Sequence, residues 1–233
     1  MDTLSSRIQE IQNYILFLEG TEGKAANMPV LKEVSDFKDR VKRTEYWRYI
    51  HSADYHYFVS RILFLRMIYT YSYFSGFQCI ENYLKAFLKY CGVAVPTKHP
   101  LGDLLDLCRG VVQPKPDFIH SRYIEVITRR FEPYYQIGRY PVQTIRPKSG
   151  TQSFLYPDDI FVLDYFVYQM RRILTIPQNT WDMFRQGKGA GLMELVSCMR
   201  EFPDFYNLVK WNNINFPDLQ EQGESQQVSL VLR

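Results

Sequence analysis

QCIENYLKAFLKYCG, residues 78–92, is the stretch from which the fold of this chain can be predicted. Apolar side chains recur in it at the three- and four-residue spacing of one α-helical face; they are Ile80, Tyr83, Leu84, Phe87, Leu88 and Cys91. Gly92 follows them and is a typical residue with which a helix ends. Glu81 and Lys85 lie four positions apart in the same segment. The stretch therefore predicts a helix that is apolar on one face and carries a charged pair.

Upstream of this stretch, the helical pattern begins near Ser52 and supplies the main apolar stripe of the chain. An internal glycine costs only about 1 kcal/mol relative to alanine. The helix is therefore expected either to continue through to Tyr90 or to break near Ser75-Gly76, and the two alternatives stay open. In both cases this segment is predicted to be the central hairpin or spine of a helical bundle.

Further helices are predicted on both sides of the spine. Gly20 is expected to end the first of them. The segment 136–157 contains two prolines and two glycines before Pro157 and is expected to be a long connection. Long connections often carry function. The predicted helices outside the spine span residues 5–18, 30–47, 100–108, 118–135, 157–174, 192–201 and 203–211.

The composition is that of a folded chain with an aromatic core. Its 233 residues are enough for a large buried core, and 46% are hydrophobic, with 18 Tyr and 16 Phe. The formal net charge of +3 is too small to indicate nucleic-acid binding by itself. Residues 97–150, however, contain nine Lys and Arg against five Asp and Glu. This local excess favours an anionic ligand.

The cysteines and the hydropathy pattern bear on the compartment. Without a C-x-x-C pair or a secretory leader, the thiols are expected to be reduced and the protein cytoplasmic. Cys91 and Cys108 lie on apolar stripes and are predicted to be core residues. The longest apolar stretch, 58–77, contains Arg61 and Arg66, so no membrane span is expected.

Three motifs occur in a fixed order: Glu81-x-x-Leu84-Lys85-Ala86, then His99-x-Leu101, then Arg139-Tyr140-Pro141. In this order they resemble the HEPN family (higher eukaryotes and prokaryotes nucleotide-binding), over residues 54–177. The resemblance implies an all-α fold, an antiparallel bundle of four or five helices that is often paired into a dimer. Family members include ribonuclease toxins, partners of small nucleotidyltransferases and domains without demonstrated chemistry. The resemblance therefore identifies a fold better than a reaction.

The resemblance also divides the chain into three parts. Residues 1–52 form an N-terminal helical extension, residues 53–177 the HEPN-like bundle, and residues 178–233 a C-terminal helical extension with a flexible tail. We expect one helical domain with additions at both ends, not two separate domains.

Glu81 and Lys85 admit two interpretations. An exposed pair in this order would stabilise the helix by only about 0.2–0.5 kcal/mol. Alternatively, both side chains line the edge of a groove in the bundle, where Lys85 meets an anion and Glu81 orients either Lys85 or a neighbouring tyrosine hydroxyl.

Arg139 and its neighbours also admit two interpretations. The guanidinium is a bidentate ligand for phosphate, and Tyr134, Tyr135 or Tyr140 is suited to stack on a base. Alternatively, Arg139 caps the carbonyls of a helix, or pairs with Glu132 or another acidic residue of the bundle, and so holds the loop in place. His99 either serves the start of the next helix or points into a cleft. The predicted ligand-binding residues are Glu81, Lys85, His99, Tyr135, Arg139 and Tyr140.

The sequence lacks the ribonuclease signature of active HEPN enzymes, an Arg followed four to six residues later by His near the last bundle helix. That chemistry needs histidine as acid or base and a cation for the developing phosphate charge. Arg171 and Arg172 are followed by no histidine, since the last one is His120. No catalytic residue is assigned, and a noncatalytic role is favoured.

No metal or cofactor is predicted either. His51, His56 and His120 have no spacing relative to other metal-binding side chains that would build a metal site.

The sequence thus favours a noncatalytic HEPN-like module that binds a nucleotide or the phosphate of a nucleic acid such as RNA. It would act beside a nucleotidyltransferase or in a prokaryotic defence or toxin–antitoxin system, as a homodimer and away from membranes. The alternative is a structural homodimerisation or protein-interaction module. A divergent, metal-independent ribonuclease is the third interpretation.

Overall fold

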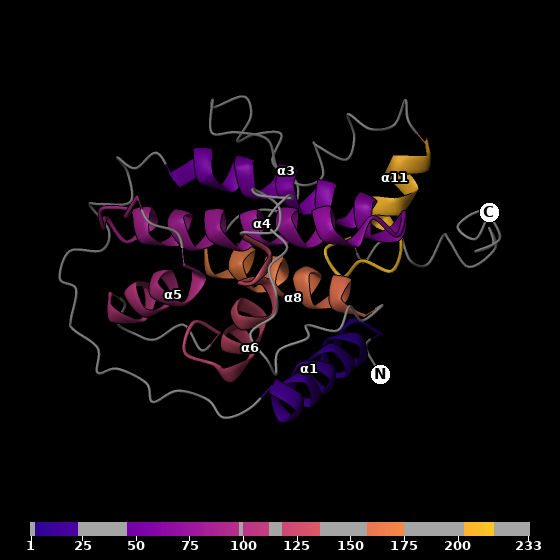
Figure 1. Cartoon of the computed structure of the whole chain (residues 1–233), viewed down its shortest axis with the longest axis horizontal. Coiled ribbons are helices and arrows are strands. Elements are labelled where there is room, and N and C mark those ends of the chain that lie inside the picture. The colour runs from indigo at the N-terminus through magenta and orange to yellow at the C-terminus, as the bar shows by residue number, and fades with distance from the viewer. Residues whose placement is uncertain are drawn as a thin grey trace.

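The computed structural model describes residues 3–22, 46–97, 100–111, 118–135, 158–174 and 203–216. Every regular element in these ranges is an α-helix, which confirms the predicted all-α class (Figure 1). The helices are α1 (Thr3–Glu22), α3 (Tyr46–Leu65), α4 (Tyr69–Tyr90), α5 (Leu101–Gly110), α6 (Arg122–Phe131), α8 (Asp159–Ile173) and α11 (Pro203–Lys210).

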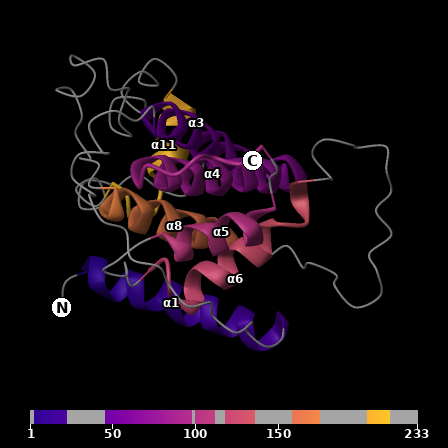
Figure 2. The ribbon, with the colours of Figure 1, turned by 90° about the vertical axis from the view of Figure 1, so that its left-hand side faces the viewer.

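The spine is an antiparallel hairpin of α3 and α4, which lie side by side along their lengths (Figures 1 and 2). The N–H of Ile68 donates to the carbonyl of Leu63 (2.8 Å), and the N–H of Met67 donates to that of Phe64 (2.9 Å). This pair of bonds is the Schellman pattern that ends a helix. Met67 has a φ of 61°, in the left-handed region that a glycine would occupy without strain.

Both predicted alternatives for this helix were therefore wrong, because the break lies at Met67. Gly76 lies inside α4, where it permits a close approach between helices instead of ending one. A Cβ atom at Gly76 would lie 2.4 Å from Cε1 of Phe131 at the end of α6. The start near Ser52 was also late, since α3 begins at Tyr46.

The boundaries of the other described helices differ from the predicted ones by four residues or fewer. α1 continues to Glu22, past Gly20, and the helix predicted over 118–135 is regular only over α6. The predicted segments 157–174 and 203–211 correspond to α8 and α11. The predicted helix 192–201 and most of 30–47 lie outside the described residues.

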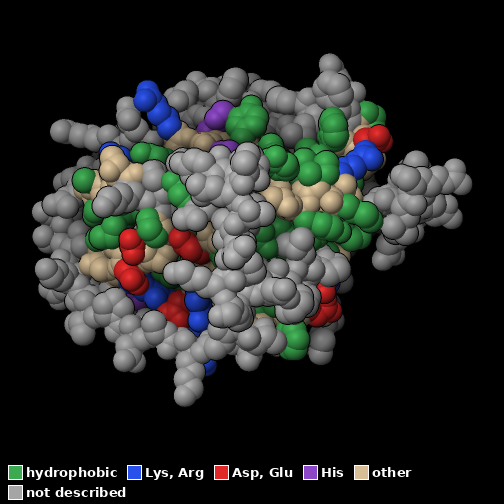
Figure 3. Space-filling model, in the orientation of Figure 1, with side chains coloured by type: hydrophobic (Ala, Val, Ile, Leu, Met, Phe, Trp, Pro, Cys, Tyr) green, Lys and Arg blue, Asp and Glu red, His purple; other side chains and the backbone are tan. Residues whose placement is uncertain are grey.

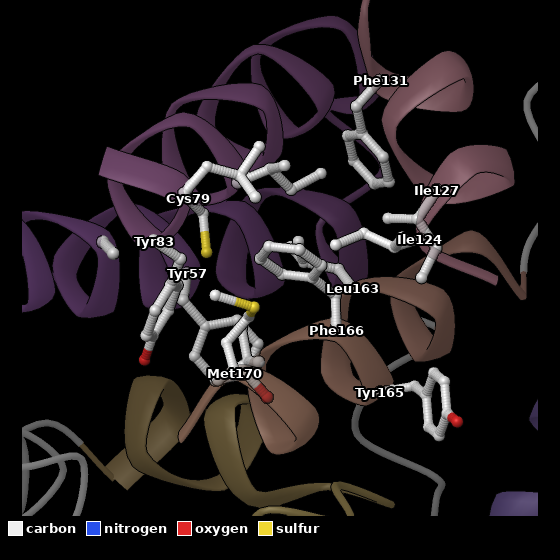
Figure 4. Close-up of a cluster of buried hydrophobic side chains, with 14 of the residues drawn as sticks. Tyr57, Cys79, Tyr83, Ile124, Ile127, Phe131, Leu163, Tyr165, Phe166 and Met170 are labelled. Atoms are coloured by element: carbon white, nitrogen blue, oxygen red, sulfur yellow. The ribbon is translucent and has the colours of Figure 1, made fainter. Parts of the chain in front are cut away.

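α8 packs against both helices of the spine, and α5 and α6 pack against α4. α1 contacts α6 and α8 on the side away from α3 (Figures 1 and 2). The core is aromatic, as predicted. Figure 4 shows Tyr57, Tyr83, Phe166 and Met170 gathered between the helices. Cys79, Cys91 and Cys108 are buried free thiols.

Three ion pairs of α8 are buried within this core. Arg171 Nη1 donates to both carboxylate oxygens of Asp54 on α3, at 3.0 and 2.9 Å. Asp164 pairs with Arg61 on α3, and Asp159 accepts from Nη2 of Arg130 at the end of α6 (2.8 Å).

Tyrosine hydroxyls complete each pair. Tyr83 donates to Asp54, Tyr57 to Asp164 at 2.7 Å, and Tyr14 of α1 to Asp159 at 2.8 Å. Buried charges are tolerated where they are paired and hydrogen-bonded in this way. These bonds tie α8 to α1, α3, α4 and α6.

None of the helices in the described ranges combines the length and the hydropathy needed to cross a membrane. On the face shown in Figure 3, hydrophobic side chains gather over α3 and α4, whereas acidic and basic side chains gather over α5 and α6.

Candidate functional site

Glu81 and Lys85 form a nearly buried ion pair on α4. Lys85 Nζ donates to Glu81 Oε1 at 2.6 Å, and Gln78 Nε2 donates to Glu81 Oε2 at 3.1 Å. The side chains of Lys85 and Glu81 are 10% and 5% exposed. The exposed-pair interpretation is therefore wrong. A pair this well covered orients the ammonium group and has little contact with solvent.

A second carboxylate lies close to this pair. Glu132, just beyond the end of α6, accepts the backbone N–H of Leu101 at 2.6 Å. It satisfies a donor that the helix itself leaves open, and Pro100, the N-cap of α5, has no side chain that could do so. Burial raises the pKa of Glu132; the N–H groups of Leu101 and Gly102 oppose this shift, and the charge of Glu81 adds to it.

Of the two adjacent tyrosines, only Tyr135 lies at this edge in a partly exposed position. Its ring packs against Phe77, one turn before Glu81 on α4, with centroids 5.0 Å apart. Tyr134 is 5% exposed and stacks on Tyr73 at 4.4 Å. The interpretation of Tyr134 as a base-stacking residue is therefore corrected: its ring is part of the core.

We call the junction of Glu81, Lys85, Glu132, Tyr135 and the start of α5 the α4–α6 edge. It brings together three of the six predicted ligand-binding residues, Glu81, Lys85 and Tyr135. The other three, His99, Arg139 and Tyr140, lie outside the described residues. In the sequence, His99 precedes Leu101 by two positions and Arg139 follows Tyr135 by four.

His56 is a neighbour of this edge that the sequence analysis did not select. It lies half-buried on α3, and burial lowers its pKa while the charge of Glu81 opposes the shift. The hairpin brings residues from the two sides of the turn together, as with Ser60 and Ser72, whose hydroxyls are 3.3 Å apart. His56 comes from the neighbouring helix and not from the segment around Glu81, so the spacing within α4 gave no sign of it.

The described residues contain neither an activated cysteine thiol nor a cluster of metal-binding side chains. Burial raises the pKa of the thiols of Cys79 and Cys108, and raises that of Cys91 to about 12. Thiols in such surroundings are inert. Among the described residues, no group of three His, Cys, Asp or Glu side chains is placed to hold a metal ion.

Of the two arginines that were compared with the ribonuclease signature, Arg171 lies in the core. Arg171 is 1% exposed and is bound to Asp54 and Tyr83, whereas Arg172 is exposed and lies 5.4 Å from the centroid of the Tyr168 ring. Arg171 is therefore committed to holding α3, α4 and α8 together.

Comparison with known proteins identifies a family. Residues 46–153 match the family model described as HEPN domain, a range that begins with α3 and includes α4, α5 and α6. α1, α8 and α11 lie outside the matched range. No curated protein and no solved structure gives a significant match.

Proposed function

Because residues 46–153 belong to the HEPN domain family of nucleotide-binding and ribonuclease-type modules, we propose that this protein binds the phosphate of a nucleotide or of RNA at the α4–α6 edge without cleaving it. The family supports a nucleotide or nucleic acid as ligand. To this ligand class we add a site, the α4–α6 edge, and a noncatalytic role.

The observation that carries the proposal is the position of the Glu81–Lys85 pair. It lies where α4 meets the start of α5 and the end of α6, and the adjoining sequence supplies Lys98, His99 and Arg139. Glu81 orients the Lys85 ammonium group, and the 10% of this side chain that is exposed is where it would meet a phosphate. The sequence also supplies Arg139, whose guanidinium is a bidentate phosphate ligand. Tyr135 offers an aromatic ring of the kind that stacks on bases.

The noncatalytic part rests on the chemistry that is missing from this sequence. No histidine follows His120, and Arg171 is bound to Asp54 in the core. Cleavage of RNA through the family signature needs both a histidine and an accessible cation.

The test is equilibrium binding of ATP, of the other nucleoside triphosphates and of a short single-stranded RNA at two salt concentrations. We expect affinity to fall with salt, because phosphate contacts release counterions. Arg139→Gln should weaken binding by about tenfold or more, the worth of a charge-assisted hydrogen bond. Arg66→Gln is the matched control, since Arg66 pairs at 3.6 Å with the exposed Asp204 of α11.

Failure of every ligand to bind at low salt would remove the proposal. The same RNA should remain intact on a gel. Cleavage that disappears in His99→Ala would instead favour the divergent ribonuclease.

A second candidate function, as an interaction module, is favoured by exposed apolar side chains at the α3–α4 turn and on α11. Met67, Ile68 and Tyr71 are 61%, 47% and 51% exposed, and Phe205 is 42% exposed. Such side chains gathered in one region often mark protein interfaces. Here the partner would be a second copy of the chain, or a nucleotidyltransferase of a defence or toxin–antitoxin system.

Light scattering distinguishes the homodimer from the other interpretations. A dimer mass that falls to that of the monomer in Ile68→Glu would support this second function. A monomer over the whole concentration range would contradict the homodimer.

A further inference from the structure

A pocket of about 480 Å³ lies between α1, the start of α6 and the last turns of α8. It is lined by Gln12, Phe118, Ser121, Tyr123, Tyr165, Gln169, Arg172 and Ile173. α1 and α8 lie outside the range that matches the family model. The pocket is therefore built by this chain's own helices around one end of α6.

The pocket is separate from the α4–α6 edge. Its α6 residues, Ser121 and Tyr123, are at the beginning of that helix, whereas Glu132 of the edge follows its end. The ten residues of α6 span about 15 Å at 1.5 Å per residue. The two sites share no residue, so a ligand can bind to one without occupying the other.

One side of the pocket is aromatic. The Tyr165 ring meets those of Phe118 and Tyr123 edge to face, with centroids 5.6 and 6.0 Å apart. Figure 4 shows Tyr165 directed away from the core cluster around Phe166. Aromatic walls of this kind bind planar rings by stacking or edge contact.

The polar groups of the pocket are amides and a phenol. Gln12 Nε2 donates to the Tyr165 hydroxyl at 2.8 Å, and Gln169 also hydrogen-bonds that hydroxyl. Burial raises the pKa of Tyr165, so the phenol is neutral. Each glutamine amide has further donor and acceptor capacity beyond one bond to the phenol. These groups are suited to the polar edge of a heterocyclic base.

The charge at the pocket is positive. Arg172 is exposed at its rim, and none of the eight described lining residues is acidic. A single guanidinium favours a ligand with one phosphate, which it can bind with two parallel hydrogen bonds.

We propose that this pocket binds a mononucleotide, with the base against the aromatic wall of Phe118, Tyr123 and Tyr165 and the phosphate on Arg172. The volume lies within the usual range of small-molecule sites. The combination of an aromatic wall, neutral amides and one cation matches a base, its edge and a monophosphate. This proposal does not depend on the proposed function, which places the phosphate of a nucleotide or of RNA at the separate α4–α6 edge.

The affinity test uses calorimetry on the full chain with AMP, GMP, CMP and UMP, and with adenosine and ribose 5-phosphate as fragments. A nucleoside monophosphate should bind more tightly than either fragment. Arg172→Gln should weaken it by about tenfold or more, and Gln169→Trp should abolish binding by filling the pocket. Arg66→Gln, which removes the same charge near α11, should leave it unchanged.

The location test uses an azido derivative of the nucleotide that binds best, with the cross-linked peptide identified by mass spectrometry. Adducts within 118–123 or 165–173 support the pocket. Absence of binding, wild-type affinity in Arg172→Gln, or adducts confined to 134–140 would overturn the proposal. Thermal unfolding of each variant is measured alongside; if Gln169→Trp fails to fold, Arg172→Gln and the cross-link decide the outcome.

Discussion

At the scale of single residues, the main feature is that charged side chains are buried in pairs. Arg61, Asp164, Asp54 and Arg171 are each 1% exposed or less. Removing a charge from water is costly, and its partner and tyrosine hydroxyls offset that cost only while both members are present. Replacing one member of a pair should therefore lower the stability of the fold far more than replacing both members.

This predicts a large effect of Arg171→Met. The variant leaves Asp54 buried without its cation and should lower the free energy of unfolding by about 3–5 kcal/mol, measured by urea denaturation. Arg172→Met changes the adjacent, exposed arginine and should stay within about 0.5 kcal/mol. The double variant Asp54→Leu/Arg171→Met should recover much of the loss. Equal effects of the two arginine variants would contradict the buried pair as a determinant of stability.

His56 predicts a pH dependence of stability. Burial lowers its folded-state pKa below the ordinary value of 6.5, so between these two pKa values the unfolded chain binds more protons. The contribution is complete above pH 6.5 and is lost as the pH falls through the folded-state pKa. The wild type should lose more stability than His56→Gln between pH 7.5 and pH 5.5, as urea denaturation measures. Identical losses in the two proteins would show that His56 does not contribute.

At the scale of elements, the contact between α4 and α6 depends on Gly76. A methyl group there would overlap Phe131 at 2.4 Å, whereas one at Gly102 in α5 would meet nothing within 4 Å. Overpacking costs about 1–3 kcal/mol, and replacing a helical glycine by alanine gains about 1 kcal/mol.

Gly76→Ala should therefore destabilise the protein, or at best leave it unchanged, and Gly102→Ala should stabilise it; thermal unfolding measures both. Phe131→Leu in the Gly76→Ala background should remove part of the overlap. If Gly76→Ala were as stabilising as Gly102→Ala, the close approach would not exist.

The helices themselves were predictable because their periodicity is local. The position of the α3–α4 turn was not, since the apolar pattern runs through it and the left-handed position holds Met67 instead of glycine. The Glu81–Lys85 pair was found by its spacing, but its burial was not, because Glu132 and His56 approach it from other helices. Arg61 was taken only as an interruption of an apolar stretch, and its buried partner Asp164 is 103 positions away.

At the scale of the whole molecule, α1 is packed against the family domain and α8 by its apolar face. Ile11, Ile15 and Leu18 are buried, and Gln12 and Tyr14 bind residues of α8. The predicted N-terminal extension therefore contributes directly to the common core.

We expect Ile15→Ala to lower the stability of the whole chain by about 2–5 kcal/mol. Leu16→Ala, at an adjacent position that is 41% exposed, should have an effect of about 0.5 kcal/mol or less. Circular dichroism and tyrosine fluorescence should report one shared transition in both variants. An early, separate loss of helix in Ile15→Ala would indicate that α1 unfolds independently.

The three ionic groups of α8 impose a condition on how this helix can evolve. Asp159, Asp164 and Arg171 each meet an opposite charge on α6 or α3, so sliding α8 by a single turn would separate all three partnerships at once. Apolar side chains at these three positions would tolerate such a shift of α8 along its axis, whereas the ion pairs fix one alignment of α8 with α3 and α6. Changes at these positions should therefore arise in matched couples in related chains.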